Sequence, residues 1–319
     1  MKWNIFLILI YFPLTGFSQE LFPLTESANT LPKNVFAVRA YSDGNYEIKT
    51  LKVMGGLRLM YGIHSKLSVY LSASMSNHHS KFLPPDLVSH GHPSGGSPFY
   101  FTNRVARGVV YPMRWNGFHF MAKYRLLSFD QQNKHYRVAI ISDLSNVRQA
   151  HDEAEPNLYH DNRGWGIGII NSFLYHRLAI SSSIQGIFPW DYSEEQLDVR
   201  TQQLVKRIMK YGNAAKMSVS FGYLLQGNKE NSFDEPNTNI YLEFLASAWQ
   251  AAQFVYNGQT IPTLNPAFNE GYYVEIHPGI QRVIRSNLRL ELSVGIPLVH
   301  KSFVHFYPIY SIAVQRYLY

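Results

Sequence analysis

Residues 287–297, with the sequence NLRLELSVGIP, alternate between aliphatic and polar side chains. Leu290 and Leu292 fall on one side of an extended strand, and Arg289 and Glu291 fall on the other, because strand side chains alternate with a period of two. A soluble two-sheet protein could bury one such aliphatic face in its core. A chain that repeats the pattern many times fits a sheet closed in a lipid bilayer better.

The same alternation recurs along the chain and predicts twelve strands, most of them long enough to cross a bilayer. They are expected at residues 34–41, 50–63, 67–76, 117–130, 135–147, 165–176, 178–190, 204–225, 238–249, 270–284, 287–297 and 305–319. Residues 204–225 could instead form two strands broken at Gly212 and Asn213, but the count would then be thirteen, and bacterial outer-membrane barrels have an even number. The facing of the strands between 165 and 190 is ambiguous. The sequence therefore predicts an all-β fold, a transmembrane antiparallel up-and-down β-barrel of about twelve strands.

The connections between these strands fall into short turns and long polar loops. A Ser-Asp-Gly-Asn sequence at residues 42–45 is a strong turn signal. Longer polar stretches are expected as loops at residues 77–116, 148–164, 191–203 and 250–269. No repeat of 20–50 residues is visible, which argues against a propeller or a solenoid.

The first eighteen residues have the features of a secretory signal peptide: a lysine, a short apolar run and a small residue before the cleavage point. Residues 19–33 are polar, contain Pro23 and Pro32, and lack periodicity. We therefore expect a signal peptide at 1–18, a periplasmic or lumenal segment at 19–33 and a barrel at 34–319. One hypothesis is that the segment enters the lumen as a partial plug.

Composition agrees with a barrel in the bacterial outer membrane. Aromatic residues make up 15% of the chain and charged residues only 16%, which suits tyrosines placed at both membrane interfaces. A tyrosine-rich secreted β-sandwich is the alternative. The absence of cysteine excludes disulfides and a lipoprotein anchor. The net charge of +7 is not clustered, so no nucleic-acid partner is expected.

Charged side chains recur on the less apolar face of the predicted strands and would point into the lumen. These lumen-lining candidates are Lys52, Arg58, Lys123, Arg125, Arg137, Asp143, Glu243, Glu275, His277, Arg289 and Glu291. One interpretation is a set of ion pairs that stiffen the lumen and narrow any passage. The other is a selective constriction lined by cations, which would favour an anionic or phenolic solute. The two interpretations are compatible.

Two loops carry residue types that bind metals. Imidazoles in the first loop could bind Zn or Cu, and carboxylates in the second could hold a divalent cation such as Ca²⁺ and bridge lipopolysaccharide phosphates. The candidates are His78, His79, His90, His92, Asp152, Glu153 and Glu155. The spacing of fixed metal motifs is missing, so solvated polar loops are the competing interpretation.

No motif in the chain marks an enzyme. Outer-membrane phospholipases also have twelve strands, and their type of chemistry needs a Ser, a His and an orienting Asn or Asp within hydrogen-bond reach. No motif singles out such a nucleophile. The glycine-rich sequence at residues 94–98 lacks the lysine of a phosphate-binding loop. We therefore expect no enzymatic activity and no cofactor.

Three short pieces of sequence resemble a family of bacterial outer-membrane transporters that includes channels linked to phenol degradation. They are TESA with LPK at residues 25–33, LR, YGI and LSV at 57–69, and HPGIQ with LELSVGIP at 277–297. The sequences HDEAEP and SFGYLL, at 151–156 and 220–225, are similar to Bacteroidetes members. The resemblance implies a barrel that moves small or hydrophobic solutes. The histidine-rich loop departs from the phenol-type pattern, and no catalytic residue carries over.

The chain ends on Tyr319, and a terminal aromatic residue on a final strand resembles the signal read by the outer-membrane insertion machinery, although Gln315 is more polar than that signal prefers. The expected partners are thus this machinery, the lipid bilayer, lipopolysaccharide and a small-molecule solute. The expected function is an outer-membrane channel or transporter for small, hydrophobic or aromatic or anionic solutes, without nucleotide use. The alternatives are a closed barrel that displays metal-binding or partner-binding loops and, less favoured, an outer-membrane hydrolase.

Overall fold

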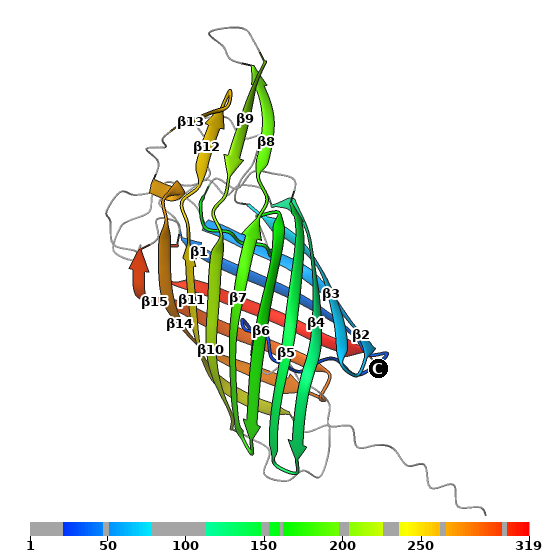
Figure 1. Cartoon of the computed structure of the whole chain (residues 1–319). Coiled ribbons are helices and arrows are strands. Elements are labelled where there is room, and N and C mark those ends of the chain that lie inside the picture. Colours follow the sequence, from blue (N-terminus) through cyan, green and yellow to red (C-terminus); the bar gives the residue numbers. More distant parts are fainter. Residues whose placement is uncertain are drawn as a thin grey trace, which may run out of the picture.

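Twelve antiparallel strands close into a barrel in the computed structural model of this protein (Figure 1). The structure describes residues 22–46, 51–77, 113–147, 153–159, 162–197, 204–225, 236–261, 266–301 and 305–318. The barrel strands are β1 (Phe36–Tyr46), β2 (Leu51–His64), β3 (Leu67–Ser76), β4 (Arg114–Gln131), β5 (Lys134–Val147), β6 (Gly164–Tyr175), β7 (Leu178–Pro189), β10 (Ala214–Leu224), β11 (Asn237–Trp249), β14 (Gly271–Ile284), β15 (Leu288–Lys301) and β16 (Ile309–Leu318). The predicted fold is therefore confirmed.

The first and last strands pair with each other and close the ring. The register runs from Phe36 opposite Leu318 to Gly44 opposite Tyr310, and β1 pairs with β2 along its other side. The predicted turn at residues 42–45 is therefore wrong, because these residues belong to β1. Ladder hydrogen bonds on both sides of the strand outweigh the local turn preference of Ser-Asp-Gly-Asn.

A second, four-stranded sheet projects beyond one end of the barrel (Figure 1). It contains β8 (Tyr192–Leu197), β9 (Leu204–Lys210), β12 (Gln253–Tyr256) and β13 (Gln259–Ile261), and a short 3₁₀ helix spans Pro266–Phe268. The prediction of loops at residues 191–203 and 250–269 is wrong where these ranges form β8, β12 and β13. Strands of three to seven residues are too short to show the alternation that identifies the barrel strands.

The prediction of one continuous strand over residues 204–225 is also wrong. The strand β9 ends at Lys210 and β10 begins at Ala214, with β9 in the projecting sheet and β10 in the barrel wall. Between them the backbone at Gly212 packs against Gln250, so that an added Cβ would lie 2.5 Å from the Gln250 Cβ. The twelve-strand count is right because β9 leaves the ring.

The aliphatic faces of the barrel strands point outward. On β15, Leu290 and Leu292 are 41% and 51% exposed, while Arg289 and Glu291 are buried in the interior. On the ambiguous strands β6 and β7, Ile167, Ile169 and Ile184 are exposed while Ser172 and Ser181 are buried, but Ile170 and Ile187 also face inward. Among the described residues, no helix is long and apolar enough to cross a membrane. The outer surface is a continuous apolar belt suited to lipid.

The interior contains an apolar core as well as charges. Met60, Met121 and Ile170 are fully buried and pack in one cluster with Ala28 and Leu31, which precede the first strand. The sequence pattern predicted only the less apolar strand faces inside the barrel. It did not predict this apolar core in the lumen. The core fills the part of the barrel through which residues 22–35 pass.

Candidate functional site: a chamber in the lumen

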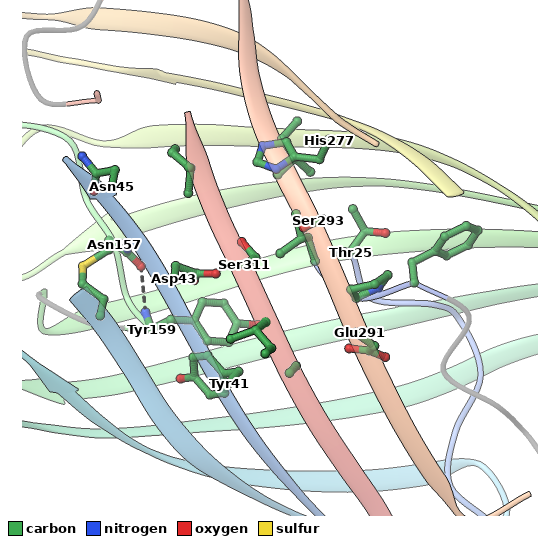
Figure 2. A pocket seen from close by; sticks show the side chains of 18 of the residues that line it. Thr25, Tyr41, Asp43, Asn45, Asn157, Tyr159, His277, Glu291, Ser293 and Ser311 are labelled. Atoms are coloured by element: carbon green, nitrogen blue, oxygen red, sulfur yellow. Dashed lines mark hydrogen bonds between the residues drawn. The ribbon is translucent and has the colours of Figure 1, made fainter. Parts of the chain in front are cut away.

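A cavity of about 270 Å³ lies inside the barrel (Figure 2). Residues 22–26 and residues 155–159 both line it, and the wall around it comes from β1, β2, β10, β11, β14, β15 and β16. We call this cavity the chamber. It is bounded by two segments of the chain that are not part of the barrel wall, and His305 and Phe306, which precede β16, also line it.

The first boundary is residues 22–34, here called the N-terminal segment, which crosses the lumen. The backbone N–H groups of Leu24 and Thr25 donate to the Glu243 carboxylate at 3.1 and 2.9 Å, and that of Ala28 donates to Ser172 Oγ at 2.8 Å. Glu243 and Ser172 lie on β11 and β6. Because the segment forms no strand or helix, its buried donors need side-chain acceptors, and the wall supplies them.

Glu26 is the ionic anchor of the N-terminal segment. Its carboxylate lies 2.7 Å from Arg58 Nη1 and 2.9 Å from Lys123 Nζ, and Lys123 also donates to the carbonyl of Ser27 at 3.0 Å. Burial raises the pKa of Glu26, but the charges of Lys123 and Arg58 outweigh it and lower the pKa to about 2. Glu26 is therefore ionised at neutral pH.

The second boundary is residues 153–159, here called the inserted loop. The ring centroid of Tyr159 lies 4.2 Å from the ring centroid of His119. It lies 5.0 Å from the guanidinium carbon of Arg58. The Tyr159 hydroxyl contacts the sulfur of Met121 at 3.6 Å. A residue of the inserted loop thus reaches the same wall residues that hold the N-terminal segment.

An ion-pair cluster fixes the inserted loop to the wall. His305 lies 2.9 Å from Glu155 of the loop and 2.6 Å from Glu275 of β14, and His277 lies 2.9 Å from Glu275. Burial lowers the pKa of His305, but Glu155 and Glu275 raise it more, to about 10. His305 is therefore charged at neutral pH and bridges two carboxylates.

Most of the predicted lumen-lining residues are buried inside the barrel. Lys52, Lys123, Asp143, Glu243, Glu275, His277, Arg289 and Glu291 are buried, and Arg58, Arg125 and Arg137 are half-buried. Of these, Lys52, Arg58, His277 and Glu291 line the chamber. Arg125 donates to the Ser65 carbonyl in the turn between β2 and β3, and Arg137 pairs with Asp130 at 2.9 Å. Arg125 and Arg137 are absent from the residues that line the chamber.

Sequence reasoning missed several chamber residues. Arg39 pairs with Glu291 at 2.6 Å and donates to the Pro23 carbonyl at 2.7 Å. Its position opposite the apolar face of β1, like that of Lys216 on β10, is the signal that could have identified it. Glu26 and Tyr159 gave no such signal, because their segments have no periodicity.

The metal prediction depends largely on residues outside the described ranges, namely His78, His79, His90, His92 and Asp152. Glu153 and Glu155 are described and buried, where they face Lys52 at 3.9 Å and His305 at 2.9 Å. Within the described part of the chain, no group of three or more metal-ligating side chains is arranged to hold an ion. Metal binding by these loops stays a prediction.

The barrel resembles solved structures in fold, although no protein-family model and no curated protein matches the sequence. An outer membrane channel from Pseudomonas putida F1 aligns with a TM-score of 0.53 and 10% identity, over 94% of this chain and 100% of that one. A NanC porin aligns at 0.43 and 8% identity, over 88% and 97%. OmpF of Salmonella typhi in complex with daunomycin aligns at 0.33 and 8%, over 89% and 97%.

At 10% identity, the likeness to the Pseudomonas channel shows a shared fold, and the lower scores of the other two carry no argument. This fold is a closed ring of strands with an apolar outer belt, which sits in a lipid bilayer. The ring and its resemblance to an outer-membrane protein support a location in the outer membrane.

Proposed function

We propose that this protein is a gated outer-membrane channel in which small solutes cross through the chamber. The observation that carries the proposal is a cavity of about 270 Å³ inside a closed barrel, bounded by two segments outside its wall. Side-chain hydrogen bonds and ion pairs hold these segments across the lumen, so they can be displaced without opening the wall. The Pseudomonas protein of the same fold is described as an outer membrane channel, which supports this role.

The lining of the chamber favours solutes with an aromatic or apolar part. Tyr41, Tyr159, Tyr241 and Tyr273 contribute to it, and ligand cavities combine such aromatic surface with a few polar groups. The cations expected to select anions are mostly tied to carboxylates, as Arg58 is to Glu26. This pairing does not favour anions over other solutes. The chamber is slightly below the usual size range of ligand pockets, which restricts it to small molecules.

A second candidate function is a permanently closed barrel that displays its outer loops to a metal or a partner. The apolar core around Leu31, built from Met60, Met121 and Ile170, favours it because it packs the N-terminal segment firmly in the lumen. In that case the ion pairs of the lumen serve stability only.

Deleting residues 19–33 separates the two candidates. The channel proposal expects swelling of liposomes that contain the deletion variant in a small sugar or amino acid, and larger single-channel conductance in planar bilayers than the intact protein gives. Ser183→Ala, which removes a hydroxyl that contacts Ser218 of the wall at 2.7 Å, is the control and should behave like the intact protein. A folded deletion variant that conducts no better than the intact barrel would favour the closed barrel.

We also propose that the C-terminus directs insertion and that the outer loops contact lipopolysaccharide. The support is that β16 continues to Leu318 and pairs there with Phe36, so that Tyr319 directly follows a barrel strand. Deleting Tyr319 should lower the fraction of protein that reaches the outer membrane. An unchanged fraction would refute the role of this residue.

A further inference from the structure

Nearly every charged side chain that lines the chamber has a partner of opposite charge. Glu26 pairs with Arg58, Arg39 with Glu291, and His305 with Glu155 and Glu275. The longer contact of Lys52 with Glu153, at 3.9 Å, completes the set, and the His277 ring lies 2.9 Å from Glu275. These charges are balanced within the protein, so they have little left to offer a solute.

Asp43 and Lys216 are the two exceptions among the described residues that line the chamber. Both are half-buried, and neither side chain has an ion pair or a hydrogen bond to another residue in the described part of the chain. The carboxylates in whose field Lys216 lies are Glu155, Asp143 and Glu275, and each of them is already held by a histidine. A charge without a partner in such a confined space is costly unless a ligand supplies one.

The two free charges lie on opposite walls. Asp43 is on β1 and Lys216 on β10, with four strands between them in one direction around the ring and six in the other. Twelve strands spaced about 4.8 Å apart and tilted by about 40° form a ring roughly 24 Å across. A molecule that reaches both charges must therefore carry its own charges well apart. An α-amino acid, with both groups on one carbon, is too short.

The surroundings of Asp43 suit a solute that hydrogen-bonds. Tyr41 and Asn45 flank Asp43 on the same face of β1, Asn157 also lines the chamber, and Ser311 lies opposite Asp43 in the register of β1 and β16 (Figure 2). Ammonium groups donate three hydrogen bonds, which a carboxylate together with amide and hydroxyl oxygens can accept. The tyrosines give an apolar surface between the two charged ends.

We propose that the chamber binds a small zwitterion with its ammonium and carboxylate at opposite ends, as in a short peptide or an ω-amino acid. The ammonium group pairs with Asp43 and the carboxylate pairs with Lys216. This assignment rests on the proposed channel function in one respect only, since it names the class of solute that the channel would admit.

Isothermal titration calorimetry on the full-length protein in detergent tests the assignment with three peptides of nearly equal size. These are triglycine, its N-acetylated form, which lacks the ammonium, and its C-terminal amide, which lacks the carboxylate. Each charge-assisted contact is strong enough that triglycine should bind at least about tenfold more tightly than either capped form. Equal binding of the three peptides, or no binding of triglycine, would overturn the assignment.

Two variants then identify the partners. With Asp43→Asn, triglycine and its acetylated form should bind equally, and with Lys216→Gln, triglycine and its amide should bind equally. Lys210→Gln, on an exposed position of the projecting sheet, is the control and should keep the preference for triglycine. If Asp43→Asn and Lys216→Gln both still bind triglycine more tightly than its capped forms, the two residues are not the partners and the proposal fails.

The calorimetric result and the channel result can be told apart. If the full-length protein binds triglycine but the variant lacking residues 19–33 does not conduct, the zwitterion site is supported and the transport function is refuted. Conductance without peptide binding would keep the channel and refute the zwitterion site.

Discussion

The guanidinium carbon of Arg58 lies 5.0 Å from the ring centroid of Tyr159, while Nη1 of the same arginine lies 2.7 Å from Glu26. One side chain therefore contacts both boundaries of the chamber, the inserted loop and the N-terminal segment. Releasing either boundary removes one of the contacts that orient Arg58 for the other. We therefore expect the N-terminal segment and the inserted loop to be released together more often than two independent segments would be.

Replacing Arg58 should weaken both closures. In Arg58→Gln the ion pair with Glu26 is lost, which costs about 1.5–3 kcal/mol because Lys123 still pairs with Glu26, and the contact over Tyr159 adds about 1 kcal/mol. We expect more frequent openings in single-channel recordings than the unchanged protein shows. Lys134→Gln, which removes an exposed cation at the turn between β4 and β5, should leave the recordings as they were. Silent recordings from a folded Arg58 variant would contradict the shared-contact account.

Acid should release the N-terminal segment through Glu26. The pKa of this group falls from the ordinary 4.5 to about 2 on docking, so its contribution to docking is complete above pH 4.5 and is lost as the pH falls toward 2. Conductance of the unchanged protein should therefore rise over this range. Glu26→Gln, which has no such titration, should conduct at neutral pH and change little between pH 4.5 and 2. A variant with the acid response of the unchanged protein would refute the role of Glu26.

Alkali should release the inserted loop through His305. Its pKa rises from 6.5 to about 10 in the folded protein, so the stabilisation is complete below pH 6.5 and disappears as the pH rises toward 10. The chain has no cysteine, so Ala154→Cys gives a single buried thiol in this loop. We expect methanethiosulfonate labelling of it to rise near pH 10, or at neutral pH when His305→Gln is added. Lys210→Cys, which is exposed, corrects for thiol ionisation. If the thiol introduced at position 154 is still not labelled at about pH 10.5, His305 does not hold the inserted loop through Glu155 and Glu275.

Strand facing is the part of the structure that the sequence predicted best. The alternation of Leu290, Leu292, Arg289 and Glu291 was sufficient, because lipid on one side leaves only one register in which no charge meets hydrocarbon. Where both faces are apolar this signal fails. Met60 and Ile170 face inward, and only the position of the N-terminal segment gives them a reason to do so.

The chamber could be predicted only in part, since its two boundaries come from segments without a pattern. Glu26 pairs with residues far away in the sequence, and Glu155, which was predicted as a metal ligand, is buried against His305. Non-local pairings of this kind depend on which segment fills the lumen. The projecting sheet was missed for a related reason, because β12 and β13 have only four and three residues.

The orientation of the wall predicts a position-dependent cost for added charge. Leu292→Arg places a cation against lipid and should lower the free energy of unfolding by about 2–4 kcal/mol. Leu204→Arg, on β9 of the projecting sheet, should change it by less than about 0.5 kcal/mol because the side chain is 70% exposed beyond the barrel. Urea titrations in phospholipid vesicles measure both. Equal costs at the two positions would mean that Leu292 does not face the bilayer.

The most direct test of the channel account is a reversible lock on the N-terminal segment. Ala28→Cys with Ser172→Cys places a thiol on each of two adjacent residues, since the Ala28 N–H now donates to Ser172 Oγ at 2.8 Å, and Ser183→Cys with Ser218→Cys joins two wall strands as the control. Each pair is added to Arg58→Gln and recorded in planar bilayers. The account predicts that oxidation silences the first protein, that dithiothreitol restores its openings, and that the control conducts in both states. Equal conductance of the first protein when oxidised and reduced would show that the segment does not close the lumen.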